Sequence, residues 1–466
     1  MRNTAKLIAI MLFIVFIINI INLSINADVA VTQEDIKDRI QSYAAVLMDG
    51  DTGQVLFEKN MNEKMYPASI TKIMTALIAL EKGNPKDTIT MSYDAVYSIG
   101  RDTSHVALDE NENLTLENAL YALAICSAND ASNGIAEYIG GSMKDFAMQM
   151  TEKAKSLGAL KTNFTNAHGL HNENHYTTAY DMAKIMAEAL KKPGFSKIFS
   201  AASYDMPPTN RQVEARQFNR KNSLLNGDYK YDGVIAEKTG WTPDSGFTFV
   251  SAARRGERTL IVVVMKSPDE ISRWEDTTAL FDYGFDEFVP LSFGAEEFIK
   301  RGYVIEATNG TAIDTDLIPT GDFTCLVLKS VAKQNIEVKY MLTTENKNIG
   351  ADTNNAGGKL HGRAVFLLNP SVSQQSMFYE LGEIDMRINI NADEKTVSDF
   401  VSGSTQSTET TKKQGSLIAK IFEIIGFIVV VILFIFVVLY IRKNIIVQRR
   451  KKRRFSGYGY KDRYYY

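Results

Sequence analysis

A serine followed three residues later by a lysine is the first feature of this 466-residue chain with the potential for chemistry. Ser69 and Lys72 stand in the run Pro-Ala-Ser-Ile-Thr-Lys, and residues 69–81 have helical periodicity without Gly or Pro. We therefore expect a helix to begin at Ser69, with Lys72 on the same face one turn later. A serine hydroxyl is a weak nucleophile until a base takes its proton, and a desolvated lysine can be neutral enough to do so. Ser-x-x-Lys also arises by chance in a chain of this length, so the motif needs support from elsewhere.

A second polar run, Cys-Ser-Ala-Asn-Asp, closes a helical stretch that begins near Leu116, and helical periodicity continues after it to residue 139. Ser127 offers a hydroxyl that can pass a proton to a leaving amine, and Asn129 offers an amide that can hold a substrate backbone. Taken alone, the run is equally consistent with a simple helix end or turn.

A third run, Lys-Thr-Gly, reads as part of a strand and precedes Trp241. Lys238 and Thr239 supply a cation and a hydroxyl that suit a carboxylate, and Gly240 admits close approach of backbone. The alternative is a solvated strand end. Glu237 stands beside Lys238, and because strand neighbours alternate between faces we expect it to point to solvent.

The three runs are far more specific together, in this order, than any one of them. Ser69, Ser127 and Lys238 are separated by 58 and 111 residues (127−69 and 238−127). This set resembles the Ser-x-x-Lys, Ser-x-Asn and Lys-Thr-Gly motifs of penicillin-binding proteins and serine β-lactamases. Residues 67–81, 126–139, 168–182 and 238–253 look like the low-molecular-mass D-alanyl-D-alanine carboxypeptidases, and the resemblance covers about residues 42–267. Two departures are Ala128, where many members have Gly, and a longer path from Gly233 to Lys238.

The resemblance implies a serine-type peptidase that acts through an acyl-enzyme. Ser69 would attack the carbonyl between two terminal D-alanines, Lys72 would act as its general base, and Ser127 would relay the proton to the departing D-alanine. Backbone N–H groups of Ser69 and Trp241 would form the oxyanion hole, and such donors contribute about 2.7–4 kcal/mol each.

The resemblance also implies how substrate is held and which partners the protein has. Asn129 would position the peptide, Lys238 and Thr239 would bind the terminal carboxylate, and Gly240 and Trp241 would complete the binding strand. The substrate would be a peptidoglycan stem peptide, and β-lactam antibiotics would be covalent inhibitors. No metal, organic cofactor or nucleic acid is implied.

The elements expected around these motifs define an α/β fold, a penicillin-binding or β-lactamase-like transpeptidase domain with helices packed on an antiparallel sheet. Strands are predicted over residues 44–49, 54–58, 247–253 and 259–265, and a further helix over 143–157. Short β-rich runs after residue 293 predict a small β domain. The predicted organisation is a signal peptide (1–27), a catalytic domain (28–290), a β-rich domain (293–391), a flexible linker (392–416), a transmembrane helix (417–441) and a basic tail (442–466).

Two apolar segments predict export and membrane attachment. Residues 7–23 follow Arg2 and Lys6 and precede a plausible cleavage site after Ala27, which is typical of a signal peptide; an uncleaved anchor is the alternative. Residues 424–441 carry no charge and are followed by a basic block. Because positive charge stays cytoplasmic, we expect a single-pass protein of the bacterial cell membrane with its catalytic domain outside and its tail inside.

The sequence also suggests several other interpretations. His168, His171 and His175 have a spacing that suggests zinc, but Gly and Asn residues between them break any helix. A Ser-His-Asp hydrolase lacks its Gly-x-Ser-x-Gly motif. Ala128 argues against a β-lactamase, and the intact motifs argue against an idle wall-binding protein, whereas an endopeptidase that cuts cross-links would use the same site. Cys126 and Cys325 are expected to be small buried side chains, although export permits a disulfide.

Overall fold

The computed structural model describes residues 33–220, 224–306, 310–344, 360–369, 379–392 and 395–396. They form two compact units. The first unit takes in the described parts of Met1–Phe293, Asp322–Lys339 and Val365–Glu383, and the second those of Gly294–Gly321, Tyr340–Ala364 and Ile384–Tyr466. The expected signal peptide, membrane span and basic tail lie outside the described residues, as does nearly all of the expected linker. No helix in the described ranges is both long and apolar enough to cross a bilayer.

The first unit is organised around a five-stranded antiparallel sheet in the order β2-β1-β9-β8-β7. Its strands are β1 (Ala44–Asp49), β2 (Val55–Lys59), β7 (Val234–Thr242), β8 (Gly246–Arg255) and β9 (Arg258–Ser267). The register pairs Val46 with Val263 and Lys238 with Val250. All four strands predicted in this part of the chain are confirmed, and β7 forms one edge of the sheet.

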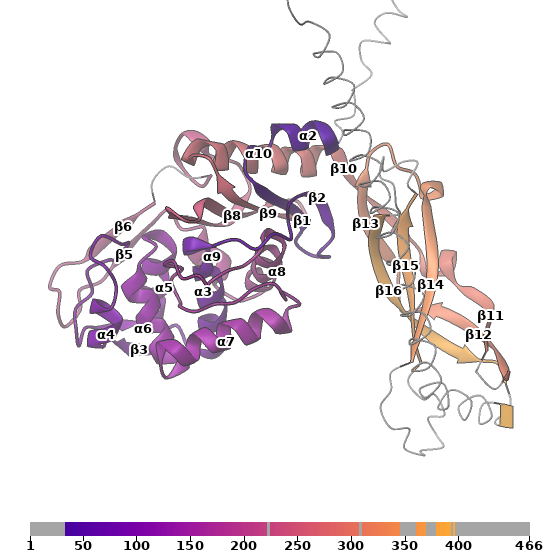
Figure 1. The fold of residues 1–466 in the computed structure, drawn as a ribbon, viewed down its shortest axis with the longest axis horizontal. Helices are drawn as coiled ribbons and strands as arrows, with labels where there is room; N and C mark the ends of the chain where they lie inside the picture. The colour runs from indigo at the N-terminus through magenta and orange to yellow at the C-terminus, as the bar shows by residue number, and fades with distance from the viewer. Residues whose placement is uncertain are drawn as a thin grey trace, which may run out of the picture. The chain divides into compact units, whose positions relative to one another are not determined.

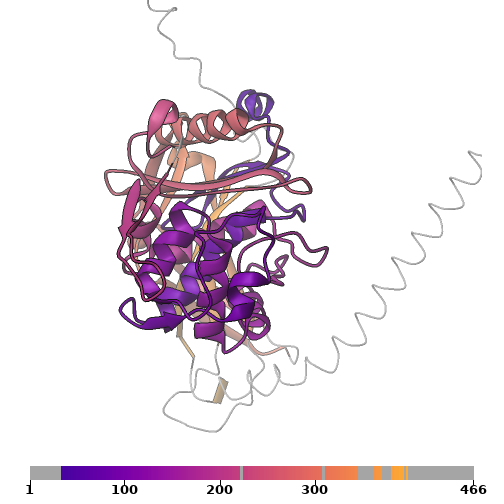
Figure 2. The same ribbon diagram turned by 90° about the vertical axis from the view of Figure 1, so that its left-hand side faces the viewer.

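Side chains on the two faces of this sheet enter two separate hydrophobic cores, as expected because successive side chains along a strand point to opposite faces. Along β1, Val46 packs in one core and Leu47 in the other. The first core lies under the helices that carry the motifs, and the second lies under α10 (Glu270–Glu287), where Trp274 is 1% exposed. Figure 1 shows α10 and α2 (Gln33–Arg39) on one side of the sheet and the other helices on the opposite side; Figure 2 gives the perpendicular view.

The helices on the motif side are mostly short and have polar N-caps, such as Thr115, Ser142 and Thr178. They are α3 (Lys72–Lys82), α4 (Tyr93–Tyr97), α5 (Leu116–Ile125), α6 (Asn129–Gly140), α7 (Met143–Ser156), α8 (Ala179–Leu190) and α9 (Phe195–Phe199). The helix over 143–157 is confirmed. The helical stretch from Leu116 ends at the polar run, as expected, with Cys126 as the C-cap of α5. The periodicity that continues to residue 139 belongs to a second helix, which starts at Asn129.

The first unit also contains three two-stranded ribbons. They pair β3 (Thr88–Thr90) with β4 (Asn113–Thr115), β5 (Ser203–Met206) with β6 (Arg216–Asn219), and β10 (Phe288–Phe293) with β13 (Phe323–Leu328). The Gln54 side chain joins the last ribbon to the β1–β2 turn, since its amide nitrogen donates to the Leu326 carbonyl and its oxygen accepts from the Leu326 N–H.

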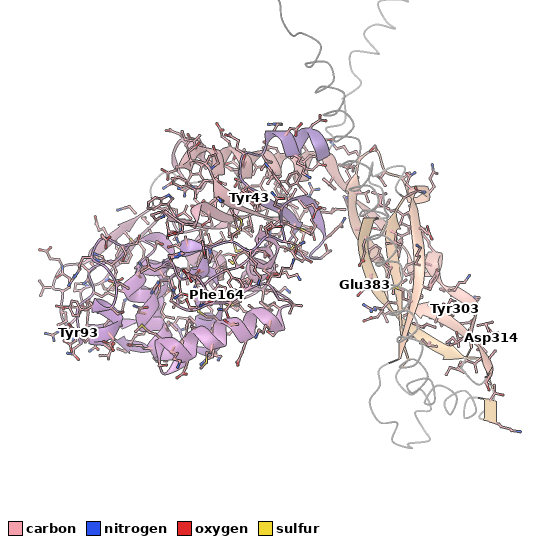
Figure 3. The ribbon with its side chains drawn as sticks, viewed as in Figure 1. Tyr43, Tyr93, Phe164, Tyr303, Asp314 and Glu383 are labelled. Atoms are coloured by element: carbon pink, nitrogen blue, oxygen red, sulfur yellow. The ribbon has the colours of Figure 1, made fainter. Side chains whose placement is uncertain are left out.

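The described residues also form a second five-stranded sheet, in the order β11-β12-β16-β15-β14. Its strands are β11 (Lys300–Glu306), β12 (Ala312–Pro319), β14 (Ile336–Thr344), β15 (Leu360–Leu368) and β16 (Tyr379–Ile390). Tyr303 and Asp314, labelled in Figure 3, lie on the neighbouring strands β11 and β12. The β-rich texture predicted after residue 293 corresponds to these strands.

Candidate active site

Ser69 lies in a single 3-10 turn (Ala68–Thr71) that leads directly into α3. The helix start expected at Ser69 is therefore confirmed, with a tighter first turn. Ala68 has a φ of 50°, in the left-handed region that costs an L-residue energy. A Cβ on Gly169 would lie 1.8 Å from the Ala68 carbonyl oxygen, so only glycine lets the loop at 169 approach this turn. The nucleophile candidate is thus held by a strained turn packed against backbone.

Lys72 is fully buried, and its amine contacts three oxygens. Its Nζ lies 3.0 Å from Ser69 Oγ, 2.7 Å from Asn129 Oδ1 and 2.7 Å from the His168 carbonyl. The amide oxygen and the carbonyl can only accept hydrogen bonds. A neutral amine would donate its two N–H groups to these two, which leaves its lone pair directed at the Ser69 hydroxyl. The geometry therefore suits proton transfer from Ser69 to Lys72.

The charge environment of Lys72 favours that neutral form. Burial lowers its pKa well below the ordinary value, the cation of Lys238 lowers it further, and the carboxylate of Asp130 opposes both effects. Asp130 is itself buried and accepts hydrogen bonds from the backbone N–H groups of Val106 and Leu108. A lysine with a lowered pKa beside a serine is the arrangement that activates a hydroxyl.

Ser127 occupies the elbow between α5 and α6 with a φ of 56°, again in the left-handed region. Strained residues of this kind concentrate at functional sites. The elbow turns the chain so that Ser127 is partly exposed, while Asn129, at the first position of α6, is 3% exposed and reaches Lys72. The short motif therefore sends its serine and its asparagine to different partners.

Lys238 brings the third motif to the same place. It is 1% exposed on β7, and its Nζ lies 3.1 Å from Ser127 Oγ and 2.8 Å from the Thr239 carbonyl. Because the Ser127 oxygen accepts from Lys238, its own O–H is free to donate elsewhere. A Cβ on Gly240 would lie 2.8 Å from Ser69 N, so glycine lets β7 pass close to the nucleophile.

The binding strand is open to a ligand along its free edge. Among the described strands, β7 pairs only with β8, so one row of its N–H and C=O groups is left for an added peptide. Thr239 is partly exposed and Trp241 is 55% exposed at this edge. The eight residues predicted for the site therefore lie on the Ser69 turn with the start of α3, on the Ser127 elbow with the start of α6, and on β7, and the contacts described above join these segments.

Glu237 departs from its prediction. It was expected to face solvent, but it is 0% exposed. Its Oε1 lies 3.4 Å from Arg220 Nη1, and its Oε2 accepts from the Leu224 N–H at 3.1 Å. Strand alternation does turn Glu237 away from the Lys238 face, but that second face is also covered, which alternation cannot reveal.

The three histidines that suggested zinc have separate partners. The His168 carbonyl accepts from Lys72, and His171 Nδ1 lies 3.6 Å from Asp244 Oδ2. Across the described residues, no group of three or more potential metal ligands was found. His168, His171 and His175 thus support the loop around the site individually.

His175 braces the nucleophile turn from behind. Its Nδ1 accepts from the Thr165 N–H at 3.1 Å, so the proton of the neutral ring lies on Nε2, which donates to Thr71 Oγ1 at 2.8 Å. Burial, followed by the charges of Lys72 and His171, lowers the pKa of His175 to about 3. The ring is therefore neutral at every pH at which the site would work.

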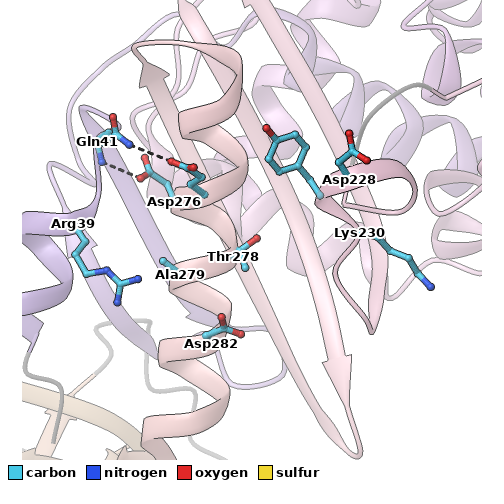
Figure 4. A pocket seen from close by; sticks show the side chains of 10 residues that line it. Arg39, Gln41, Asp228, Lys230, Asp276, Thr278, Ala279 and Asp282 are labelled. Carbon is cyan, nitrogen blue, oxygen red and sulfur yellow. Dashed lines mark hydrogen bonds between the residues drawn. The ribbon is translucent and has the colours of Figure 1, made fainter. Parts of the chain in front are cut away.

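Two other features lie outside this contact network. A hollow of about 550 Å³ beside α10, drawn in Figure 4, is lined by Arg39, Lys230, Asp282 and others and contains none of the motif residues. Both cysteines are free: Cys325 is buried as expected, but Cys126, next to Ser127, is only half-buried.

Sequence reasoning did not identify several groups that shape the site. Asp130, Arg220 and the backbone of His168 act on Lys72 or Lys238, and Thr248 Oγ1 donates to the Pro67 carbonyl at 2.8 Å. Asp130 had a signal, because it directly follows Asn129 in the motif. Arg220 and Thr248 had none, since their contacts span long sequence separations.

Known proteins resemble the part of the chain that contains the candidate site. A family model described as D-alanyl-D-alanine carboxypeptidase matches residues 29–269, just over half of the chain. The chain is 37% identical over 253 residues to the D-alanyl-D-alanine carboxypeptidase DacF of Bacillus subtilis (strain 168), a match that covers 53% of this chain and 63% of that protein. It is 30% identical over 345 residues to DacA of Haemophilus influenzae, a match that covers 71% of this chain and 82% of that protein.

Solved structures extend the likeness to the fold. Penicillin-binding protein 5 from Haemophilus influenzae aligns with a TM-score of 0.58 and 26% identity over 76% of this chain and 98% of the other. The α/β penicillin-binding fold predicted from the motifs is therefore confirmed. The match to DacF spans less than two thirds of that relative's own length.

Proposed function

This chain belongs to the D-alanyl-D-alanine carboxypeptidase family, and we propose that it is a serine-type hydrolase that removes the terminal D-alanine from peptidoglycan stem peptides. The observation that carries the proposal is the pair of contacts Lys72–Ser69 (3.0 Å) and Lys238–Ser127 (3.1 Å). They supply a base for the nucleophile and a second hydroxyl held by a cation, which acyl transfer to a serine requires.

The first half of the reaction forms an ester. Ser69 Oγ attacks the carbonyl carbon of the penultimate D-alanine while its proton passes to Lys72 Nζ. The oxyanion lies between the backbone N–H groups of Ser69 and Trp241. When the C–N bond breaks, the departing amine takes a proton from Ser127, Lys72 passes the proton it received from Ser69 on to Ser127, and free D-alanine leaves.

The second half restores the enzyme. Water attacks the ester carbonyl and its proton passes to the neutral amine of Lys72. The C–Oγ bond then breaks, Ser69 Oγ takes that proton from Lys72, and the shortened peptide is released. Lys238 and Thr239 hold the terminal carboxylate during the first half, and Asn129 holds the peptide backbone through both. β-Lactams enter the same path and remain attached to Ser69 as covalent inhibitors.

The test is D-alanine release from a peptide ending in D-Ala-D-Ala, with the full chain and its Ser69→Ala variant side by side. We expect release by the parent and none by the variant, together with a penicillin adduct on the parent alone by intact mass. If neither protein releases D-alanine but the parent cleaves cross-linked peptide dimers, the activity is that of an endopeptidase. Rapid turnover of a β-lactam by the parent would point to a β-lactamase instead.

The same proposal includes membrane attachment. Residues 424–441 are 18 consecutive uncharged residues (441−424+1), and Arg442 and Lys443 follow at once. This length and the basic flank support a single span with a cytoplasmic tail and an exported catalytic domain. The test is protease protection in intact cells from which the wall has been removed. External protease is expected to degrade the catalytic domain and to spare an epitope placed after Tyr466; a catalytic domain protected until the membrane is opened would contradict this topology.

A further inference from the structure

Lys238 is 1% exposed and is surrounded by other charged groups. Burial, then the cations of Arg220 and Arg273, lower the pKa of Lys238 to about 7, while Glu237 and Cys126 oppose this. Lys72 adds a further amine on the cleft side, since Lys238 in turn lowers the pKa of Lys72. Of these four charged or ionisable neighbours of Lys238, Glu237 alone carries a carboxylate. The charge of the proposed carboxylate-binding lysine thus depends on a balance between buried neighbours.

Glu237 is placed to set this balance. It directly precedes Lys238 on β7, and its side chain is 0% exposed. Arg220, whose side chain is 6% exposed, approaches Glu237 Oε1 to 3.4 Å and also donates to the carbonyls of Phe199 (3.3 Å) and Ala201 (3.2 Å). The guanidinium is therefore fixed by backbone as well as by the carboxylate. A buried carboxylate is costly unless it is paired, so its position here is a specific feature of the site.

We propose that Glu237 is a positioning residue for substrate binding: its buried carboxylate keeps the Lys238 amine cationic and thereby sets how tightly the site holds ligands that end in a carboxylate. Arg220, which pairs with this carboxylate, acts on the charge of Lys238 in the opposite direction. The inference rests on the proposed function, because it takes Lys238 as the group that binds the terminal carboxylate.

Substitutions of Glu237 and Arg220 should shift the pKa of Lys238 in opposite directions. Lys238 binds a carboxylate when protonated, so binding weakens as pH rises through the pKa of Lys238. Glu237→Gln removes the anion and keeps the side-chain shape, so the pKa falls and the alkaline limb of kcat/KM moves to lower pH. Arg220→Gln removes a cation, so the same limb moves to higher pH. Nonspecific damage to the site would not be expected to shift the alkaline limb of kcat/KM in opposite directions in the two variants.

The experiment measures kcat/KM for D-alanine release and, in parallel, the second-order rate constant for acylation by benzylpenicillin, both between pH 5 and pH 10. Penicillin also bears a carboxylate, so its limb reports on Lys238 even if the peptide is not cleaved. We expect each substitution to move the limb by about one pH unit, as for one unit charge removed within a few ångströms. For Glu237→Gln, KM should rise about tenfold above pH 7 while kcat changes little.

The control is Glu257→Gln, which removes an exposed carboxylate from the β8–β9 turn and should leave the limb in place. A limb that stays fixed in Glu237→Gln, or that moves the same way in both cluster variants, overturns the inference. If Glu237→Gln does not fold, Arg220→Gln decides, since the charge account requires a shift to higher pH. A parent that releases no D-alanine refutes the proposed function, whereas the penicillin limbs still decide the role of Glu237.

Discussion

Replacing Lys72 by methionine keeps an unbranched side chain in the same buried space and removes the amine. The amine is the only group in the contact network placed to take the Ser69 proton, at 3.0 Å from Ser69 Oγ. A positioned general base contributes about 10²–10⁴-fold to rate. This corresponds to about 3–5 kcal/mol of activation free energy, and we expect acylation of Lys72→Met to slow by that factor.

The same substitution should destabilise the fold only moderately. It leaves Asn129 Oδ1 and the His168 carbonyl without the donor that reaches each at 2.7 Å. Each buried acceptor left unpaired costs about 1–3 kcal/mol, and burial of the methionine thioether offsets part of this. The free energy of unfolding should therefore fall by a few kcal/mol at most, which leaves the protein folded for assay.

The assay is the second-order rate constant for acylation by a fluorescent penicillin, measured from pH 5 to pH 10. For the parent, the rate should rise with pH as Lys72 loses its proton, because the base must be neutral. Since burial and Lys238 lower the pKa of Lys72, this rise should lie well below the pH at which an exposed lysine titrates. In Lys72→Met the rise should disappear along with the rate, and Ser69→Ala should form no adduct at all.

Acylation of Lys72→Met within tenfold of the parent, with the same acid limb, would refute the assignment of Lys72 as the base. Circular dichroism and thermal unfolding of the variant establish that a lost rate reflects chemistry and not unfolding. A slow variant that keeps the acid limb would place the titrating group elsewhere, and Lys238 and His168 would then be substituted next.

Three further substitutions test separate parts of the site. Gly240→Ala places a methyl 2.8 Å from Ser69 N, so β7 must move and acylation should fall by about 10²–10³-fold, as when an oxyanion donor is lost; a rate near that of the parent would show that the strand yields freely. His175→Leu removes the donor to Thr71 and should slow acylation by about 10–100-fold, whereas His175→Gln should restore most of the rate because its amide can both accept and donate. Asp276→Ala leaves two backbone N–H groups before β1 unpaired and should lower the free energy of unfolding by about 2–6 kcal/mol in denaturant titration, with acylation of the folded protein unchanged.

The local spacing of apolar residues predicted many of the helices and strands of the fold. Helical periodicity over residues 69–81 and alternating or continuous apolar runs over 247–253 and 259–265 each predicted an element that the structure contains. These patterns reflect the spacing at which apolar side chains recur along a helix or a strand, and this spacing can be found from a short stretch of sequence. The end of the helical stretch at the Ser127 motif was also expected, but the apolar spacing on both sides of the elbow did not show that a second helix starts at Asn129.

The candidate site was identified from residue types and their order along the chain, because acyl transfer needs a nucleophile, a base, a proton relay and a carboxylate-binding cation. Because these residues are far apart in the sequence, only the resemblance to a family predicted that they act together. The distances between Lys72 and Asn129, and between Lys238 and Ser127, arise from the packing of α3, α6 and β7, which connects residues 57 and 111 positions apart.

Burial was decided by the tertiary structure alone. Alternation along β7 correctly separates Glu237 from Lys238, but it does not say whether the second face meets water or protein, and here it meets Arg220. Likewise, the histidines at 168, 171 and 175 had a spacing that suggested a metal, yet their loop turns them to Lys72, Asp244 and Thr71. The sequence by itself determined which chemical groups are present and which elements carry them. Packing decided which groups are desolvated and paired, and therefore which charges they bear, because burial and neighbouring charges act through space and not along the chain.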